Sequence, residues 1–253
     1  MSTVLPEQKP GYPSGDGKPM AETGIHVMTI MWLHMTLLDF FENRPDVFIA
    51  SDTFWYWEEG NPKARIAPDV MVVPGIGNDL RGSYFSWEEP TKAPAIVFEM
   101  ASKNTWREDL TKKKVRYRKL GVPEYIVFDP EAIYLYDEPL IGFELVGNRY
   151  VRKKRQTDGS LATQLGFRVR REDRVLRLID STTGKPLLLP REKQAEYQRV
   201  VEALAHEQRT TALVEAEKQR ADAEKLRAEQ LAAEVERLKA MLQSQNPNHG
   251  NGS

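Results

Sequence analysis

Apolar residues follow two different periods in the first two thirds of the chain. Between Thr23 and Phe41 they recur every three to four positions, which predicts an amphipathic helix that ends at Asn43-Arg44-Pro45. Alternating or continuous apolar runs then predict three strands, at residues 48–57, 67–73 and 95–100. The third run is almost entirely apolar, so we expect that strand in the centre of a sheet.

A second helix and a fourth strand follow. Residues 107–120 predict a helix capped by Gly121, and residues 124–128 predict a strand that ends at Asp129-Pro130. Short apolar segments beyond it predict an antiparallel β extension, at residues 133–136, 143–146, 150–154, 165–169 and 175–179. This order predicts an α/β (α+β) fold with a mixed sheet core flanked by helices. The pattern is not that of a dinucleotide-binding domain, and it contains no glycine-rich phosphate motif.

The last quarter of the chain has a different composition. Residues 191–243 contain no glycine, proline or tryptophan and are rich in alanine and charged residues, which predicts one long helix. Leu231, Val235, Leu238 and Leu242 have the spacing of a coiled-coil seam, but alanines upstream weaken it. Two interpretations stay open: the helix pairs with a partner helix and forms a homo-oligomer, or it is a single solvated helix.

These patterns divide the chain into four parts. Residues 1–20 are rich in proline and glycine, residues 21–190 carry the core, residues 191–243 form the charged helix, and residues 244–253 form a polar tail. We expect no regular structure in the first part and disorder in the last.

The amino-acid composition excludes several kinds of functional site. The 253 residues include no cysteine, which excludes a disulfide scaffold, a thiolate nucleophile and a cysteine-ligated metal. The 36 basic and 37 acidic residues nearly cancel, so any attraction to an anion depends on where the charges lie. The sequence shows no membrane span and no signal peptide, so we expect a cytoplasmic protein without membrane contact.

Two acidic residues lie in apolar strand patterns. Asp69 follows Pro68 in the second strand, and Glu99 is near the end of the central strand. An ionised carboxylate in such a place requires a cation, a hydrogen-bond donor or a metal. If Ile96 and Phe98 face one side of the sheet, Glu99 faces the other side, which the following helix also covers.

That following helix presents a lysine. Asp109, Lys113 and Tyr117 are four residues apart and therefore share a face. Two carboxylates with an inward lysine suit metal-assisted phosphodiester hydrolysis, in which carboxylate oxygens hold Mg²⁺ and lysine offsets charge on the phosphate. The same residues also permit a structural interpretation, with Asp69 at an edge or turn and Glu99 in an ion pair.

Basic residues are concentrated after Glu99. Residues 103–119 contain eight lysines and arginines against two acidic residues. From this run we select as candidate nucleic-acid contacts Lys103, Arg107, Lys112 and Arg116. Phosphate contacts of this kind predict strong salt dependence. Trp55 and Trp57 share one strand face, where core packing is favoured over base stacking because aromatic side chains dominate cores.

Several stretches together resemble the Uma-two family within the PD-(D/E)XK nuclease superfamily. They are Asp16–Thr23 with His26, Glu58–Lys63, Ala67–Val70, Phe98-Glu99 with Ser102 and Thr105, Arg107–Leu110 with Lys113 and Tyr117, and Gly121–Tyr125 followed by Asp129-Pro130. As a set over residues 12–190 these motifs are specific, whereas singly none is.

The resemblance implies a restriction-endonuclease-like core that cleaves DNA with Mg²⁺ or Mn²⁺, with RNA not excluded. By position, Asp69 and Glu99 would bind the metal, Lys113 would assist the attacking water or the phosphate, and Glu22 would be an accessory acid. The superfamily's usual lysine position holds Ala101 here, and Lys113 would substitute for it. This departure leaves open a non-catalytic nucleic-acid-binding or regulatory protein on the same fold.

The resemblance also includes the stretch before the first helix. It implies that Asp16–Thr23 folds over the mouth of the site. His26 then has two interpretations, a partly buried helix histidine bonded to a backbone group or a contact to water or phosphate.

Overall fold

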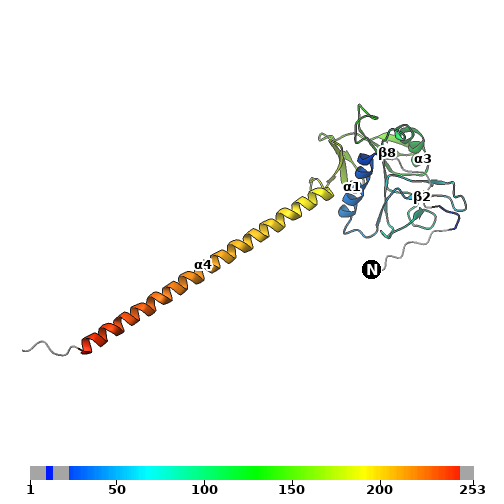
Figure 1. Ribbon diagram of the computed structural model, residues 1–253. Helices are drawn as coiled ribbons and strands as arrows, with labels where there is room; N and C mark the ends of the chain where they lie inside the picture. Colours follow the sequence, from blue (N-terminus) through cyan, green and yellow to red (C-terminus); the bar gives the residue numbers. More distant parts are fainter. Residues whose placement is uncertain (1–9, 14–22, 246–253) are drawn as a thin grey trace, which may run out of the picture. The chain divides into compact units, whose positions relative to one another are not determined.

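The structure is a computed structural model, and it describes residues 10–13 and 23–245 (Figure 1). It contains two compact units, Met1–Glu192 and Lys193–Ser253. Most of the predicted N-terminal segment and the tail beyond residue 245 lie outside the described residues, as does Glu22. Within the described ranges, no helix is both long enough and apolar enough to cross a membrane.

A mixed six-stranded sheet forms the centre of the first unit. Its spatial order is β1 (Val47–Ser51), β4 (Val70–Pro74), β6 (Ile96–Met100), β7 (Glu124–Phe128), β8 (Leu140–Val146) and β9 (Arg149–Arg152). Of these described strands, β6 and β7 pair in parallel, and the other neighbours pair antiparallel. The predicted mixed α/β class is confirmed, with the strand that carries Glu99 inside the sheet.

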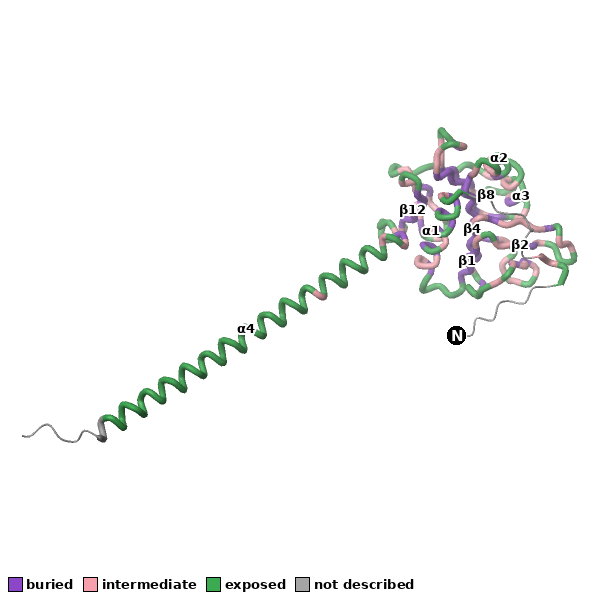
Figure 2. Tube along the Cα trace, viewed as in Figure 1, coloured by how far each residue is buried: buried purple, intermediate pink, exposed green. Residues whose placement is uncertain are grey.

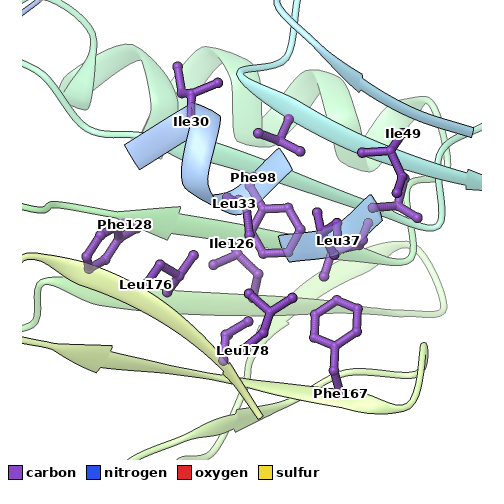
Figure 3. Packing of buried hydrophobic residues seen from close by; sticks show 14 of the residues in the cluster. Ile30, Leu33, Leu37, Ile49, Phe98, Ile126, Phe128, Phe167, Leu176 and Leu178 are labelled. Atoms are coloured by element: carbon purple, nitrogen blue, oxygen red, sulfur yellow. The ribbon is translucent and has the colours of Figure 1, made fainter. Parts of the chain in front are cut away.

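Helices and small sheets cover both faces of the central sheet. One face packs against α1 (Gly24–Phe40) and a sheet of β10 (Leu161–Ala162), β11 (Phe167–Glu172) and β12 (Val175–Asp180). Figure 3 shows Leu33 and Leu37 of α1 in one cluster with Phe98, Ile126 and Leu178. Full burial of each such side chain stabilises the fold by roughly 1.5–3 kcal/mol.

The other face packs against the basic helical segment and the third sheet. The segment consists of α2 (Trp106–Glu108), η1 (Asp109–Lys113) and α3 (Lys114–Lys119), and the sheet of β3 (Arg65–Ile66), β2 (Phe54–Tyr56) and β5 (Ser83–Phe85). Val97 belongs to this second cluster, whereas Ile96 and Phe98 belong to the first. The alternation predicted for β6 is therefore confirmed, and Glu99 faces the helical segment.

The strand predicted over residues 48–57 is in fact two strands in different sheets. Asp52, with φ +48°, adopts a left-handed conformation between β1 and β2 and redirects the chain. Trp55 of β2 is fully buried, so core packing is confirmed there. β4 begins at Val70, so Asp69 immediately precedes the strand rather than lying inside it.

The predicted strand at residues 133–136 is wrong, and β5 was not predicted. The buried carboxylate of Asp129 accepts hydrogen bonds from the N–H groups of Glu131, Tyr134 and Leu135, at 3.1, 2.6 and 2.8 Å. These bonds hold the segment as a loop, because one side chain binds backbone donors that a strand would direct to a neighbour.

The second unit is dominated by the long helix α4 (Pro190–Gln245), which confirms the predicted helix. Its residues are exposed along nearly the whole described length (Figure 2). Leu231, Leu238 and Leu242 are 71%, 52% and 69% exposed. The seam that they would form in a coiled coil therefore contacts little within the described chain.

Candidate active site

The register of two strands brings Asp69 beside Glu99. Val70 of β4 pairs with Phe98 of β6, and the chains run antiparallel, so the residue before Val70 lies next to the residue after Phe98. The Asp69 Oδ2 atom accepts a hydrogen bond from the Met100 N–H at 2.5 Å. The Asp69 side chain is 14% exposed, whereas that of Glu99 is fully buried.

The helical segment supplies donors to both oxygens of Glu99. Lys113 Nζ lies 2.7 Å from Oε2, and the Tyr117 hydroxyl donates to Oε1 at 2.5 Å. Lys113 Nζ also lies 3.0 Å from Oδ1 of Asp109. The structure therefore assembles Asp69, Glu99, Asp109 and Lys113 into what we call the carboxylate–lysine cluster.

Burial dominates the electrostatics of the carboxylates. It raises the pKa of Asp69 to about 7, that of Glu99 to about 7 and that of Asp109 to about 6, although the nearby Lys113 charge opposes each rise. Ionising all three carboxylates would leave the cluster with more negative than positive charge. Such a site has a net attraction for a cation.

The pKa of Lys113 is decided by the neighbouring carboxylates rather than by burial. Burial lowers the pKa of Lys113, but the charges of Glu99, Asp109 and Asp69 outweigh burial and raise it above its ordinary value. Lys113 is therefore an ammonium group at neutral pH. It can donate hydrogen bonds and neutralise charge, but it cannot accept a proton from water in this state.

A pocket of about 300 Å³ opens at Asp69. Its described lining consists of His26, Val27, Ile30, Met31, Ser51, Asp52 and Asp69. His26 is buried, and its Nε2 atom lies 3.9 Å from Asp69 Oδ2. The structure thus places the predicted candidate His26 at the pocket, against the carboxylate that the pocket exposes.

The four predicted nucleic-acid contacts lie on the surface and do not line this pocket in the described chain. Lys103, Arg107, Lys112 and Arg116 are all exposed. The Arg107 guanidinium lies 4.3 Å from the Trp106 ring centroid, and that of Arg116 lies 5.4 Å from the Trp57 ring. Glu99, by contrast, is fully buried, and Lys113 and Tyr117 donate to its carboxylate.

Asp52 is a site residue that the sequence analysis missed. It lines the pocket, and its charge contributes to the raised pKa of Asp69 after burial and the charge of Asp109. Its left-handed conformation places it there. The polar pair Ser51-Asp52, which interrupts the apolar alternation of residues 48–57, was the available signal.

A protein-family model matches most of the chain. The family model of Uma2, described as "Putative restriction endonuclease", matches residues 5–174, about two thirds of the chain. The chain belongs to the Uma2 family. The resemblance seen in the sequence motifs is therefore confirmed, and all four members of the carboxylate–lysine cluster lie within the matched span of this Uma2 protein.

One solved structure is also similar to this Uma2 chain. It is described as "a putative nuclease belonging to DUF820 from Anabaena variabilis ATCC 29413", with a TM-score of 0.42 and 16% sequence identity, over 63% of this chain and 84% of that chain. The comparison with curated proteins finds no match.

The donor set of the Uma2 site fits a hard divalent cation. Among the described residues, no group of three or more histidine, aspartate or glutamate side chains has the arrangement of a metal site. Magnesium does not require one, because it commonly binds one or two carboxylates and keeps several water ligands. Asp69 and Glu99 are adjacent, offer oxygen donors and lie in a cluster with excess carboxylate, which is the chemistry that such a cation selects.

The free energy of unfolding of the metal-free Uma2 protein is expected to fall by roughly 2–4 kcal/mol as the pH rises from 5 to 8. The pKa values of Asp69, Glu99 and Asp109 are raised to between about 6 and about 7, so the folded chain binds more protons than the unfolded chain in this window. Removing protons therefore favours unfolding. Denaturant titrations in chelator at pH 5, 6.5 and 8 measure this slope.

The ion-paired Glu192 does not contribute to the change in the free energy of unfolding between pH 5 and 8. The Arg177 guanidinium lowers the pKa of Glu192 to about 2, so the stability that Glu192 contributes is lost only under more acidic conditions. A free energy of unfolding that rises between pH 5 and 8 would contradict the electrostatics assigned to the cluster.

Proposed function

We propose that this Uma2 protein is a divalent-metal-dependent endonuclease that hydrolyses phosphodiester bonds in DNA. The observation that carries the proposal is the contact of Lys113 Nζ with Glu99 at 2.7 Å. The superfamily's usual lysine position is occupied by Ala101 in this chain. Lys113, from the following helix, would take the place of that lysine. The adjacent Asp69 faces a pocket, so one side of the cluster is accessible to a substrate.

Three members of the cluster, together with Tyr117, have roles in this proposal. Asp69 and Glu99 would hold Mg²⁺ or Mn²⁺, which would polarise the phosphoryl group and lower the pKa of a bound water. Lys113, held as an ammonium, would orient the water or stabilise the charge that develops on the phosphate. Tyr117 would fix the orientation of Glu99 through its hydrogen bond to Oε1.

The substrate in this proposal is DNA, whose phosphodiester backbone matches both the cluster and the surface charge. Phosphate contacts by the exposed residues Lys103, Arg107, Lys112 and Arg116 would release counterions, so binding should weaken steeply with salt. His26 and Asp52 would contact the substrate or its water inside the pocket.

Cleavage of plasmid DNA by the purified full chain is the test of this function. We expect nicking or cutting with Mg²⁺ or Mn²⁺, no product in chelator, and loss of product as NaCl rises from 50 to 200 mM. Absence of cleavage on supercoiled, linear and single-stranded DNA with either metal would contradict the proposal.

A second function is favoured by one feature of the same site. Both oxygens of the buried Glu99 already have protein donors, so this carboxylate is satisfied without a metal. A non-catalytic protein that binds nucleic acid on this fold would show this arrangement too. Binding of DNA that is equal with and without metal, together with no cleavage of DNA or RNA, would establish this alternative.

We further propose that α4 mediates self-association of the protein. The seam residues Leu231, Val235, Leu238 and Leu242 are all exposed, and burying them against a second copy would remove apolar surface from water. A parallel pair would place Val at one seam position and Leu at the next, which favours two strands.

Removal of α4 beyond Glu196 is expected to convert a dimer to a monomer and to leave metal-dependent cleavage in place. This end point keeps the Arg177–Glu192 ion pair of the first unit, at 2.6 Å. Sedimentation velocity of the full and shortened chains measures the change, with Leu238→Gln in the full chain as a matched point variant. The same number of chains per particle for all three proteins would exclude the proposed role of α4.

A further inference from the structure

The helical segment that carries Lys113 contains a π-turn. The turn η1 covers Asp109–Lys113, between α2 and α3. In a π-turn each carbonyl bonds to the N–H five residues ahead, and single turns of this kind are rare and occur frequently at functional sites. The contacts that hold this turn therefore bear on what the segment does.

The turn aligns two side chains on the Glu99 carboxylate and a third beside the Lys113 ammonium. In a regular α-helix, side chains four residues apart are rotated by about 40° around the axis, so Asp109 and Tyr117 would differ by about 80°. A π-turn has more residues per turn, so it rotates less per residue and counters this drift. Lys113 and Tyr117 accordingly both reach Glu99, at 2.7 and 2.5 Å, and Asp109 lies 3.0 Å from the Lys113 ammonium.

A side chain from the central sheet contacts the first residue of the turn. The hydroxyl of Tyr125, on β7, donates a hydrogen bond to the main-chain carbonyl of Asp109 at 2.9 Å. Tyr125 is fully buried, and its ring centroid lies 5.1 Å from that of Tyr117. Its backbone pairs with Val97 of β6, the strand that carries Glu99. The bond therefore ties the π-turn to the strand pair that holds the carboxylate.

We propose that Tyr125 is a positioning residue for Lys113, an inference that rests on the proposed nuclease function. The Tyr125 hydroxyl fixes Asp109 at the start of the turn, and the turn holds the Lys113 ammonium between Asp109 and Glu99. Tyr125 acts on the reaction only through Lys113, because its hydroxyl faces the backbone of the turn and not the pocket at Asp69.

Tyr150 provides a matched control for this inference. Its hydroxyl donates to the main-chain carbonyl of Val122 at 2.9 Å, the same length as the Tyr125 bond. The two rings stack at 6.0 Å between centroids, in the same aromatic group. Tyr150→Phe and Tyr125→Phe therefore delete the same chemical group from two stacked rings, of which Tyr125 is the more deeply buried, and only the second deletion touches the π-turn.

The experiment compares these two variants in the full chain. Tyr125→Phe is expected to lower kcat about fivefold with KM for DNA unchanged, the factor that corresponds to one hydrogen bond. Amide hydrogen exchange over residues 110–114, measured without metal or DNA, is expected to accelerate about fivefold as well. Tyr150→Phe should lose similar stability against denaturant and leave both kcat and this exchange unchanged.

Each remaining result decides a separate point. The inference is overturned if kcat of Tyr125→Phe equals that of the parent or of Tyr150→Phe. It is also overturned if amide hydrogen exchange in the turn is unchanged. In either case the proposed nuclease function stands. Parent-level cleavage by Lys113→Ala contradicts the role proposed for Lys113 and removes the inference with it. No cleavage by the parent contradicts the proposed function itself.

Discussion

Asp69→Asn protein is expected to lose at least about a hundredfold in kcat for DNA cleavage and to unfold less readily at pH 8 than the parent. The carboxylate is a proposed metal ligand, and its loss would weaken the binding of the cation that stabilises the negative charge developing on the phosphate. Burial raises the pKa of Asp69 to about 7, so its ionisation at pH 8 opposes folding. Asparagine removes this cost and can still accept the Met100 N–H bond, which should add roughly 1–3 kcal/mol to the free energy of unfolding.

Plasmid cleavage and denaturant unfolding of the same preparations measure both effects. Asp46→Asn is the matched control, because Asp46 is an exposed aspartate whose carboxylate pairs with Arg44. We expect the control to keep the parent values of both quantities. Cleavage by Asp69→Asn at the parent rate would show that Asp69 has no role in the reaction.

Lys113→Ala is expected to lower kcat for DNA cleavage by a similar factor but, unlike Asp69→Asn, to destabilise the fold. The substitution leaves the buried carboxylates of Glu99 and Asp109 without their ammonium partner, and breaking a buried pair in this way costs about 3–5 kcal/mol. The loss should be smaller at pH 5 than at pH 8, because the raised pKa values let both carboxyls bind protons at the lower pH. Denaturant titrations at the two pH values measure this difference.

Lys112→Ala is the matched control for this variant. Lys112 is the preceding residue and is exposed, so its removal should leave the free energy of unfolding unchanged. Equal stability of the two variants at pH 8 would contradict the assigned burial of the Lys113 contacts. Both Asp69→Asn and Lys113→Ala should lose cleavage, but their effects on the free energy of unfolding should be opposite. The pair therefore distinguishes cleavage lost with a catalytic group from cleavage lost through a less stable fold.

Much of the cluster could be predicted because it depends on local periodicity. The alternation of Ile96, Val97 and Phe98 assigns Glu99 to one face of β6, and the four-residue spacing of Lys113 and Tyr117 assigns them to one face of the helix. Both rules follow from backbone geometry alone. The resemblance to the Uma2 family added the pairing of these two elements.

Other features depend on individual side chains or on the conformation of one residue, which hydrophobic periodicity does not reveal. The π-turn at Asp109 is held by Tyr125 from a later strand, and the loop after Asp129 is held by one carboxylate that binds three backbone donors. The separation of β1 from β2 depends on a left-handed Asp52, which apolar alternation across residues 48–57 conceals. Side-chain tethers and single-residue turns of this kind override periodicity.

The donors on Glu99 have a consequence for assembly of the protein. Lys113 and Tyr117 satisfy both carboxylate oxygens within the chain itself. Proteins whose ligands lack such partners fold only when the metal binds, so that binding and folding share one free energy. In the proposed function the two processes would be uncoupled, because Glu99 has its donors without a metal and the cation would bind to an already folded site.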